Sequence, residues 1–308
     1  MYILGEPVPH RLAILVPFLF VFIYGSGFVG AKLGLPHSDP FTFLALRFLL
    51  AAALLALLAV LRHSRWRVEN VKAVVVSGLL LQGAFSAGVF YALSLGMKPA
   101  VAALIIALQP LLVAVLGGFY LGERVHFQRW LGLLIGVAGV SLVVAGGLTT
   151  EGITLAGLVW CLLGLLGLTT GQLVQKKHCA TMDLFVGGFF QSLTAGVAMS
   201  LGAVAFEPLS VVWSDDFIIA LVWMGVGVSI GALSLLYFML RHSTANQVAS
   251  VFYGVPVAAA LVAWPMFDQV PEPIDWLGFS IVTLSIIIAN GRIRFRKPLR
   301  LLEWVRSL

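Results

Sequence analysis

Apolar residues dominate the chain in ten runs of about 18–25 residues, separated by short polar connections. Each run is long enough to cross a hydrocarbon core of about 30 Å as an α-helix rising about 1.5 Å per residue. Barrel strands would alternate apolar and polar positions, and these runs do not. The pattern therefore predicts an all-α integral membrane protein with ten transmembrane helices, over Leu12–Ala31, Phe41–Leu61, Ala73–Met97, Pro99–Leu121, Trp130–Leu148, Ile153–Val174, Leu184–Phe206, Phe217–Leu240, Ala245–Phe267 and Ile274–Gly291.

The two halves of the chain resemble each other. A shift of 146 residues places "QPLLVAVLGGFYLGERVHFQRWLG" on "VPVAAALVAWPMFDQVPEPIDWLG" without a gap, so that Trp130 coincides with Trp276. Five predicted helices precede the loop near Thr149–Gly152 and five follow it. Because each half has an odd number of helices, the halves enter the membrane in opposite directions, which is the inverted repeat common in secondary transporters. We predict a first repeat over residues 1–149, a second over 150–295 and a basic cytoplasmic tail over 296–308.

Two prolines occupy equivalent positions in this repeat. Pro110 falls inside the fourth predicted helix, and Pro256 falls inside the ninth. A proline inside a helix removes one backbone hydrogen bond and kinks the helix. A structural kink is one interpretation. The other is that the paired bends are hinges where the halves flex during alternating access.

Composition and charge are consistent with a membrane protein. Hydrophobic residues make up 60% of the chain and charged residues 10%, and the mean hydropathy is +1.04. A soluble domain would be about 25% charged. Placing both termini in the cytoplasm puts 16 of the 19 basic residues on that side, in accordance with the positive-inside rule. The net charge of +6 therefore indicates contact with anionic lipids rather than with nucleic acid.

Polar and aromatic side chains within the predicted helices are the candidates for a substrate cavity. Aromatic walls with a few polar groups suit a neutral or zwitterionic organic solute. Each amide or phenol could equally form only an interhelical hydrogen bond. The candidates are Tyr24, Gln82, Tyr91, Gln109, Trp160, Gln172, Gln191, Tyr237, Tyr253 and Trp264.

No Asp or Glu lies in the central part of a predicted helix, although many proton-coupled carriers use one there. A facilitated carrier or an exchanger is therefore favoured over a proton antiporter, and a purely cationic substrate is disfavoured. Cys161 and Cys179 lack metal-ligand spacing, as do the six histidines, so we expect no metal site and no cofactor.

Three charged residues are candidates for a gating or structural role. Arg47 lies within the apolar run "FTFLALRFLLAAALLALLAV", where an unpartnered charge costs about 2.5–3.5 kcal/mol on insertion scales. It should point into the bundle, either as a structural link or as an outer gate and anchor for a substrate carboxylate. Lys32 lies at the external end of the first helix, where its side chain could simply reach the interface. Glu123 ends the fourth helix, either as a solvated end or as a gate.

The motifs "YGSGFVGAKLGL", "LALRFLLAAALL" and the "LGE" at Glu123 resemble the EamA-type transporters of the drug/metabolite transporter superfamily. The resemblance covers the whole chain and is strongest in the first half. In the second half "FDQ", ending at Gln269, stands in place of "LGE". The resemblance implies a bacterial inner-membrane exporter or carrier of amino acids, related metabolites or small drugs, with a central cavity between the halves. It leaves the substrate, the coupling ion and the choice between monomer and homodimer open.

Other functional classes make different demands on the sequence. A channel or a lipid scramblase is the main alternative to a carrier. A membrane-embedded enzyme is less favoured, because prenyl and glycosyl transferases need an acidic metal motif or a catalytic loop, and Asp215–Asp216 stands alone in a short loop. We therefore expect a small-molecule transporter and not an enzyme.

Overall fold

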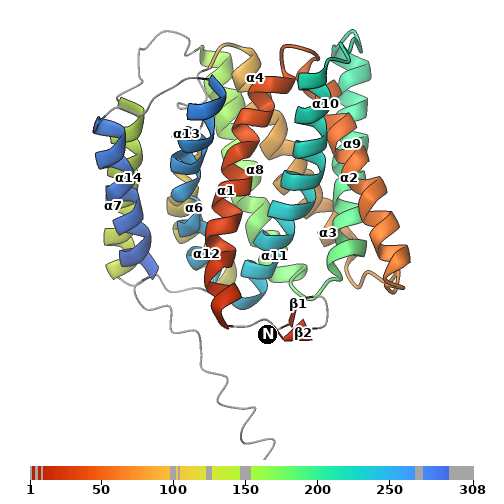
Figure 1. The fold of residues 1–308 in the computed structure, drawn as a ribbon. Helices are drawn as coiled ribbons and strands as arrows, with labels where there is room; N and C mark the ends of the chain where they lie inside the picture. Colours follow the sequence, from red (N-terminus) through yellow and green to blue (C-terminus); the bar gives the residue numbers. More distant parts are fainter. Residues whose placement is uncertain are drawn as a thin grey trace, which may run out of the picture.

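The protein is a bundle of long helices in a computed structural model (Figure 1). The structure describes residues 2–3, 6–7, 10–97, 102, 105–122, 127–145, 154–267 and 273–290. Apart from one antiparallel pair of two-residue strands near the N-terminus, β1 and β2, the described elements are helical. This confirms the predicted all-α class.

The helices follow the predicted apolar runs, and several runs are divided into shorter elements. In chain order the elements are β1 Tyr2–Ile3, β2 Glu6–Pro7, α1 His10–Gly34, α2 Pro40–Leu61, α3 Val71–Gly78, η1 Leu79–Ala84, α4 Phe85–Ser94, α6 Gln109–Leu121, α7 Phe127–Ala145, α8 Leu155–His178, α9 Leu184–Phe206, α10 Asp215–Val222, η2 Trp223–Ala232, α11 Leu233–His242, α12 Ala245–Val251, α13 Gly254–Phe267 and α14 Pro273–Asn290.

Seven helical stretches in the described part of the chain are long and apolar enough to cross a membrane. Their outward surfaces carry large apolar side chains: Phe18 is 69% exposed, Phe119 88% and Phe206 78%. Exposed apolar area on this scale marks a surface that faces lipid rather than water. The remaining three predicted spans correspond to the shorter or only partly described stretches at α6, α7 and α14. The count of ten stays a prediction.

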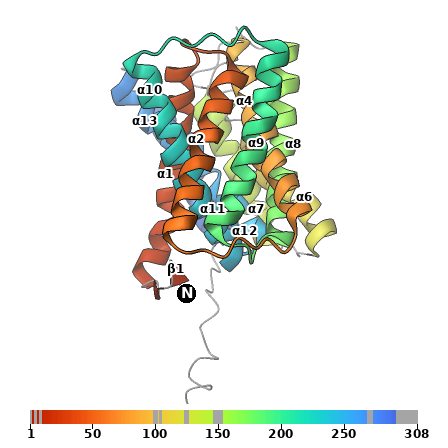
Figure 2. The same cartoon turned by 90° about the vertical axis from the view of Figure 1, so that its right-hand side faces the viewer.

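Helices from the two halves of the sequence pack side by side. The closest pairs are α2 with α9, α4 with α8, α1 with α13 and α7 with α14. Figure 1 shows α7 and α14 together at one edge of the bundle, and Figure 2 shows α2 beside α9. Each pair joins a first-half helix to a second-half helix, so neither half is a separate body.

Two long apolar stretches contain a π-helical segment in the middle. In one stretch η1 lies between α3 and α4, and in the other η2 lies between α10 and α11. Adding 146 to the bounds of η1 gives 225 and 230, which fall inside η2. A π-helical turn is wider than an α-helical one and is frequent at functional sites. The two interruptions therefore follow the same offset as the sequence repeat.

The helices that contain the paired prolines are also interrupted. Ala107 and Leu108 form a turn directly before α6, and Pro110 lies in the first turn of α6. Phe252 and Tyr253 likewise form a turn before α13, in which Pro256 is the third residue. Each proline thus begins a new helical segment, where its missing N–H costs no hydrogen bond, instead of kinking a continuous helix.

Candidate functional site

A pocket opens between helices of both halves. The space between its walls is about 510 Å³, including the part open to solvent. Five regions of the chain supply its lining: α1, α2, the η1 and α4 stretch, η2 and α11. The lining residues are Tyr24, Gly27, Phe28, Ala31, Arg47, Phe48, Leu81, Gln82, Phe85, Ser86, Val89, Phe90, Met224, Val228 and Leu233.

Both π-helical segments contribute to the lining. Leu81 and Gln82 belong to η1, and Met224 and Val228 belong to η2. Trp223 at the start of η2 donates a hydrogen bond from Nε1 to Ser26 Oγ of α1 at 2.9 Å, which holds η2 against α1. The wide turns thus lie where first-half and second-half helices meet around the pocket.

A glycine in α1 allows η2 to approach. A Cβ added at Gly30 would lie 2.8 Å from Met224 Sδ, closer than non-bonded atoms come. Met224 therefore fills the space that a side chain at residue 30 would take, and it does so beside the pocket. Because methionine is unbranched and polarisable, it adapts to irregular space.

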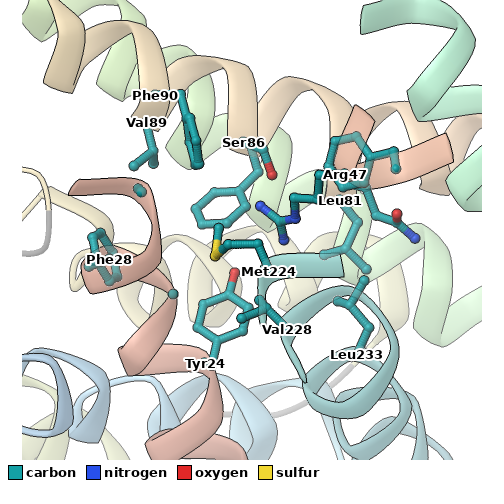
Figure 3. A pocket seen from close by; sticks show the side chains of 15 residues that line it. Tyr24, Phe28, Arg47, Leu81, Ser86, Val89, Phe90, Met224, Val228 and Leu233 are labelled. Carbon is teal, nitrogen blue, oxygen red and sulfur yellow. The ribbon is translucent and has the colours of Figure 1, made fainter. Parts of the chain in front are cut away.

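Arg47 is the one charged side chain among the described residues that line the pocket. The side chain is only 5% exposed, as a position facing into the bundle requires. Its Nε donates a hydrogen bond to Ser229 Oγ of η2 at 2.8 Å, and its Cζ lies 4.9 Å from the centre of the Phe48 ring. Figure 3 shows the guanidinium, the Ser86 hydroxyl and the Tyr24 hydroxyl directed toward the same space.

Aromatic rings form one wall of the pocket. Tyr24 stacks on Phe20 at 5.0 Å and on Phe85 at 6.0 Å between ring centres, and Phe252 meets Tyr24 edge-on at 5.3 Å. Such ring pairs stabilise the fold by more than the burial of their apolar area alone would. The Tyr24 ring is therefore held in place by its neighbours, with its hydroxyl toward Arg47 and Ser86 (Figure 3).

The end of the bundle farther from the N-terminus is held by one carboxylate. Glu207, just after α9, accepts hydrogen bonds from the Phe41 and Thr42 backbone N–H groups, each at 2.7 Å. It also accepts from the Thr42 hydroxyl at 2.8 Å and from the Tyr91 hydroxyl at 2.7 Å. Since the first N–H groups of a helix have no partner within it, Glu207 caps α2 from another helix.

The opposite end is held by cations on helix C-termini. Lys176 of α8 donates from Nζ to the carbonyls of Leu240 and Ser243 at the end of α11. Arg241 of α11 donates to the Met182 carbonyl, just before α9. Cations are stabilised by the partial negative charge at a helix C-terminus. These contacts tie α8, α9 and α11 together below the pocket.

A family model of EamA-like transporters matches the chain twice, at residues 11–145 and 155–291. The chain belongs to the EamA-like transporter family. With its apolar helical bundle, it is a multi-pass membrane protein of the drug/metabolite transporter superfamily.

Relatives of the EamA-like chain carry transporter names. It is 26% identical over 299 residues to the "Uncharacterized transporter YvbV" of Bacillus subtilis, covering 93% of this chain and 94% of the relative. It is 23% identical over 291 residues to a "Probable amino-acid metabolite efflux pump" of Escherichia coli, covering 92% and 96%. A solved protein structure shares the fold, with a TM-score of 0.77 at 22% identity over 93% of this chain and 99% of that one.

Among the residues predicted to line the cavity of this EamA-like protein, Tyr24 and Gln82 lie in the pocket with Arg47. Tyr91 and Trp160 lie together outside it, stacked at 4.8 Å beside Glu207. Tyr237, Tyr253, Trp264 and Lys32 also lie outside its lining, with Lys32 exposed. Glu123 lies outside the described residues, so its role as a gate stays a prediction.

The other predicted glutamines, Gln109, Gln172 and Gln191, lie outside this pocket lining and bond mainly to glutamines. Gln109 Nε2 donates to Gln172 Oε1 at 2.6 Å, and Gln172 donates to the Ala245 carbonyl at 3.0 Å. Gln191 donates to Gln175 Oε1 at 2.7 Å and to Ser77 Oγ. These bonds join α8 to α6, α12 and α9, and α9 to α3, which is the interhelical role that membrane-embedded amides commonly have.

Several site residues carried no signal in the sequence. Phe28, Phe85, Phe90 and Met224 line the pocket, but such residues are as common in any apolar helix. Ser229 was equally inconspicuous, and so was Glu207 in a short loop. The one sequence feature that pointed to a helix cap was the position of Glu207 just past the end of an apolar run.

Proposed function

We propose that this EamA-like protein is a secondary transporter that moves small organic metabolites across the bacterial inner membrane by alternating access. The observation that carries the proposal is the pocket, which lies inside a membrane-spanning bundle and is lined by both halves around a buried Arg47. Transporters typically bind substrate at such an interface between repeats. The names of the relatives support transport, and one of them supports export of amino-acid metabolites.

We further infer a topology of ten spans in two inverted five-helix repeats, residues 1–149 and 150–295, followed by a basic tail. Two matches to one family model support the duplication. The η1 segment, shifted by 146 residues, falls inside η2, and Pro110 and Pro256 are 146 residues apart, which also supports the duplication. The distribution of basic residues supports a cytoplasmic position for both termini by the positive-inside rule, and we infer that the tail lies along anionic lipid headgroups.

Alternating access would require the contacts at the two ends to break in turn. In the structure both ends are bonded, by Glu207 at one and by Lys176 and Arg241 at the other. On this proposal the paired proline breaks are the points where the helices bend. A substrate that favours one arrangement over the other shifts the balance by its difference in affinity for the two.

The test is counterflow in liposomes that contain the purified protein. Vesicles preloaded with an unlabelled metabolite should accumulate the labelled form, and the rate should saturate and be inhibited by competing substrates. Protein-free vesicles are the control. A flux that rises without saturation would identify a channel, and transbilayer movement of labelled lipid without counterflow would identify a scramblase.

A further inference from the structure

We propose that the pocket selects organic monocarboxylates with an apolar body, and that Arg47 binds the carboxylate. This specifies the substrate class of the proposed transporter and rests on that proposal only for the claim that the bound molecule is carried. The binding claim itself rests on the charges and walls of the pocket. The proposal predicts that amines do not bind, and that amino acids bind more weakly than the corresponding acids without the amino group.

The cation of the pocket has no counter-ion among the residues that the structure describes. Arg47 donates to one described residue, Ser229, whose hydroxyl is neutral. A guanidinium has five N–H donors in a planar fork that matches a carboxylate, and the bond from Nε uses one of them. Buried charges are costly unless they are paired. A bound carboxylate would supply the missing pair.

Among the described residues of the lining, none has an acidic side chain that could receive an ammonium group. The polar members other than Arg47 are Tyr24, Gln82 and Ser86, all neutral. The carboxylate of Glu207 accepts four hydrogen bonds outside this lining. A zwitterion would therefore gain one strong contact through its carboxylate, while its ammonium group would lie near another cation and meet no counter-charge among the described lining residues.

The rest of the lining is suited to hydrocarbon. Phe28, Phe48, Phe85 and Phe90 face the pocket with Met224, and aliphatic side chains complete the walls. The polar groups gather on the Arg47 side, where Figure 3 shows Ser86 and Tyr24 directed toward the guanidinium. This division into one charged corner and apolar walls matches a molecule with a single carboxylate and an apolar remainder.

Four probes with the same phenylpropyl body separate the charges. They are 3-phenylpropionate, phenylalanine, 3-phenylpropylamine and the neutral 3-phenylpropanol. Binding to the purified full-length protein is measured by calorimetry and by thermal stabilisation, since a ligand of the folded state raises its melting temperature. We expect 3-phenylpropionate to bind about tenfold or more tightly than phenylalanine or the alcohol, and the amine not to bind.

The Arg47→Gln variant tests whether the guanidinium binds the carboxylate. The Arg47→Lys variant keeps the positive charge but lacks the planar donor geometry of the guanidinium. We expect the Gln variant to bind 3-phenylpropionate about 10–100-fold more weakly and the alcohol unchanged, with the Lys variant intermediate. Arg65→Gln is the matched control, because it removes the same charge from an exposed loop position outside the pocket. Unchanged binding of the alcohol also shows that the variants keep the fold of the pocket.

The result that would overturn the inference is phenylalanine or the amine binding as tightly as the acid. Acid binding that survives Arg47→Gln undiminished would overturn it too. Transport is scored separately, by counterflow of labelled 3-phenylpropionate. If the acid binds through Arg47 but is not carried, the proposed transport fails while the binding class stands. If amino acids are carried and the acid neither binds nor competes, the transporter proposal stands and this inference fails.

Discussion

At the scale of single residues, two charges in the bundle have opposite surroundings. Glu207 accepts four hydrogen bonds, from two backbone N–H groups and two hydroxyls. Arg47 donates to one described residue although it is only 5% exposed. A charge whose bonds are satisfied within the protein serves the fold. A buried charge with donors to spare is available to a ligand, and we therefore assign the two residues different roles.

We expect Glu207→Gln to destabilise the protein by about 1–3 kcal/mol, because hydrogen bonds to a charged acceptor are worth more than neutral ones. Tyr91→Phe removes only the phenolic donor and should cost about 1 kcal/mol. Thermal unfolding of the purified variants in detergent measures both effects. A melting temperature equal to the wild type for Glu207→Gln would show that the carboxylate does not hold α2.

The sequence identified the residues that stand out from an apolar background. Arg47, Tyr24 and Gln82 were all singled out, and the structure brings them together in one pocket. Phenylalanine and methionine positions such as Phe85 and Met224 could not be identified, since the same residue types fill lipid-facing and core positions. The glutamines were also singled out, but bonding between Gln109 and Gln172 depends on helix packing that composition does not encode.

At the scale of helices, the apolar runs predicted where the elements lie but not how they are divided. The predicted run Ala73–Met97 covers most of α3 and all of η1 and α4, and the run Phe217–Leu240 lies within the stretch formed by α10, η2 and α11. A π-helical turn changes the hydrogen-bond spacing without requiring a particular residue type. The proline breaks were different, because proline itself marks the position in the sequence.

Close packing of α4 on α8 gives a test at this scale. A Cβ added at Gly88 would lie 2.5 Å from the Trp160 carbonyl oxygen and 2.6 Å from Gly164 Cα, so the helices would have to separate. We expect Gly88→Ala to cost about 1–3 kcal/mol, as overpacking does. The measurement is thermal unfolding in detergent.

Gly83→Ala is the control for that experiment, because it makes the same change in the same apolar stretch. The nearest atom to a Cβ at Gly83 is Met199 Cε at 3.7 Å, an ordinary contact. Its stability should stay within about 0.5 kcal/mol of the wild type. Equal loss in both variants would mean that glycine matters here for helix flexibility rather than for the approach of α8.

At the scale of the whole molecule, the two ends of the bundle differ in charge. The loop after α2 contains Arg62, Arg65 and Arg67, and α8 ends with Lys176 and Lys177. The opposite end contains the loop from Glu207 to Ser214, which has no basic residue. Figure 2 shows these two loops at opposite ends. The proposed orientation places the basic end in the cytoplasm.

Cysteine labelling in intact cells tests this orientation. In a background of Cys161→Ala and Cys179→Ala, we expect Ser210→Cys to react with a membrane-impermeant maleimide and Glu69→Cys to react only after the cells are lysed. Both positions are exposed loop residues, so differences in burial do not confound the comparison. The reverse pattern would invert the proposed topology.

The packing of α2 against α9 has a consequence for the bound substrate. Of these two helices only α2 contains a cation, Arg47, since α9 contains no Lys or Arg. Although the two halves of the chain are similar, the binding site is asymmetric, with one charged end and one apolar end. An acid held by Arg47 would keep the same end toward α2 throughout each crossing. A molecule charged at both ends would find a counterpart for only one of them.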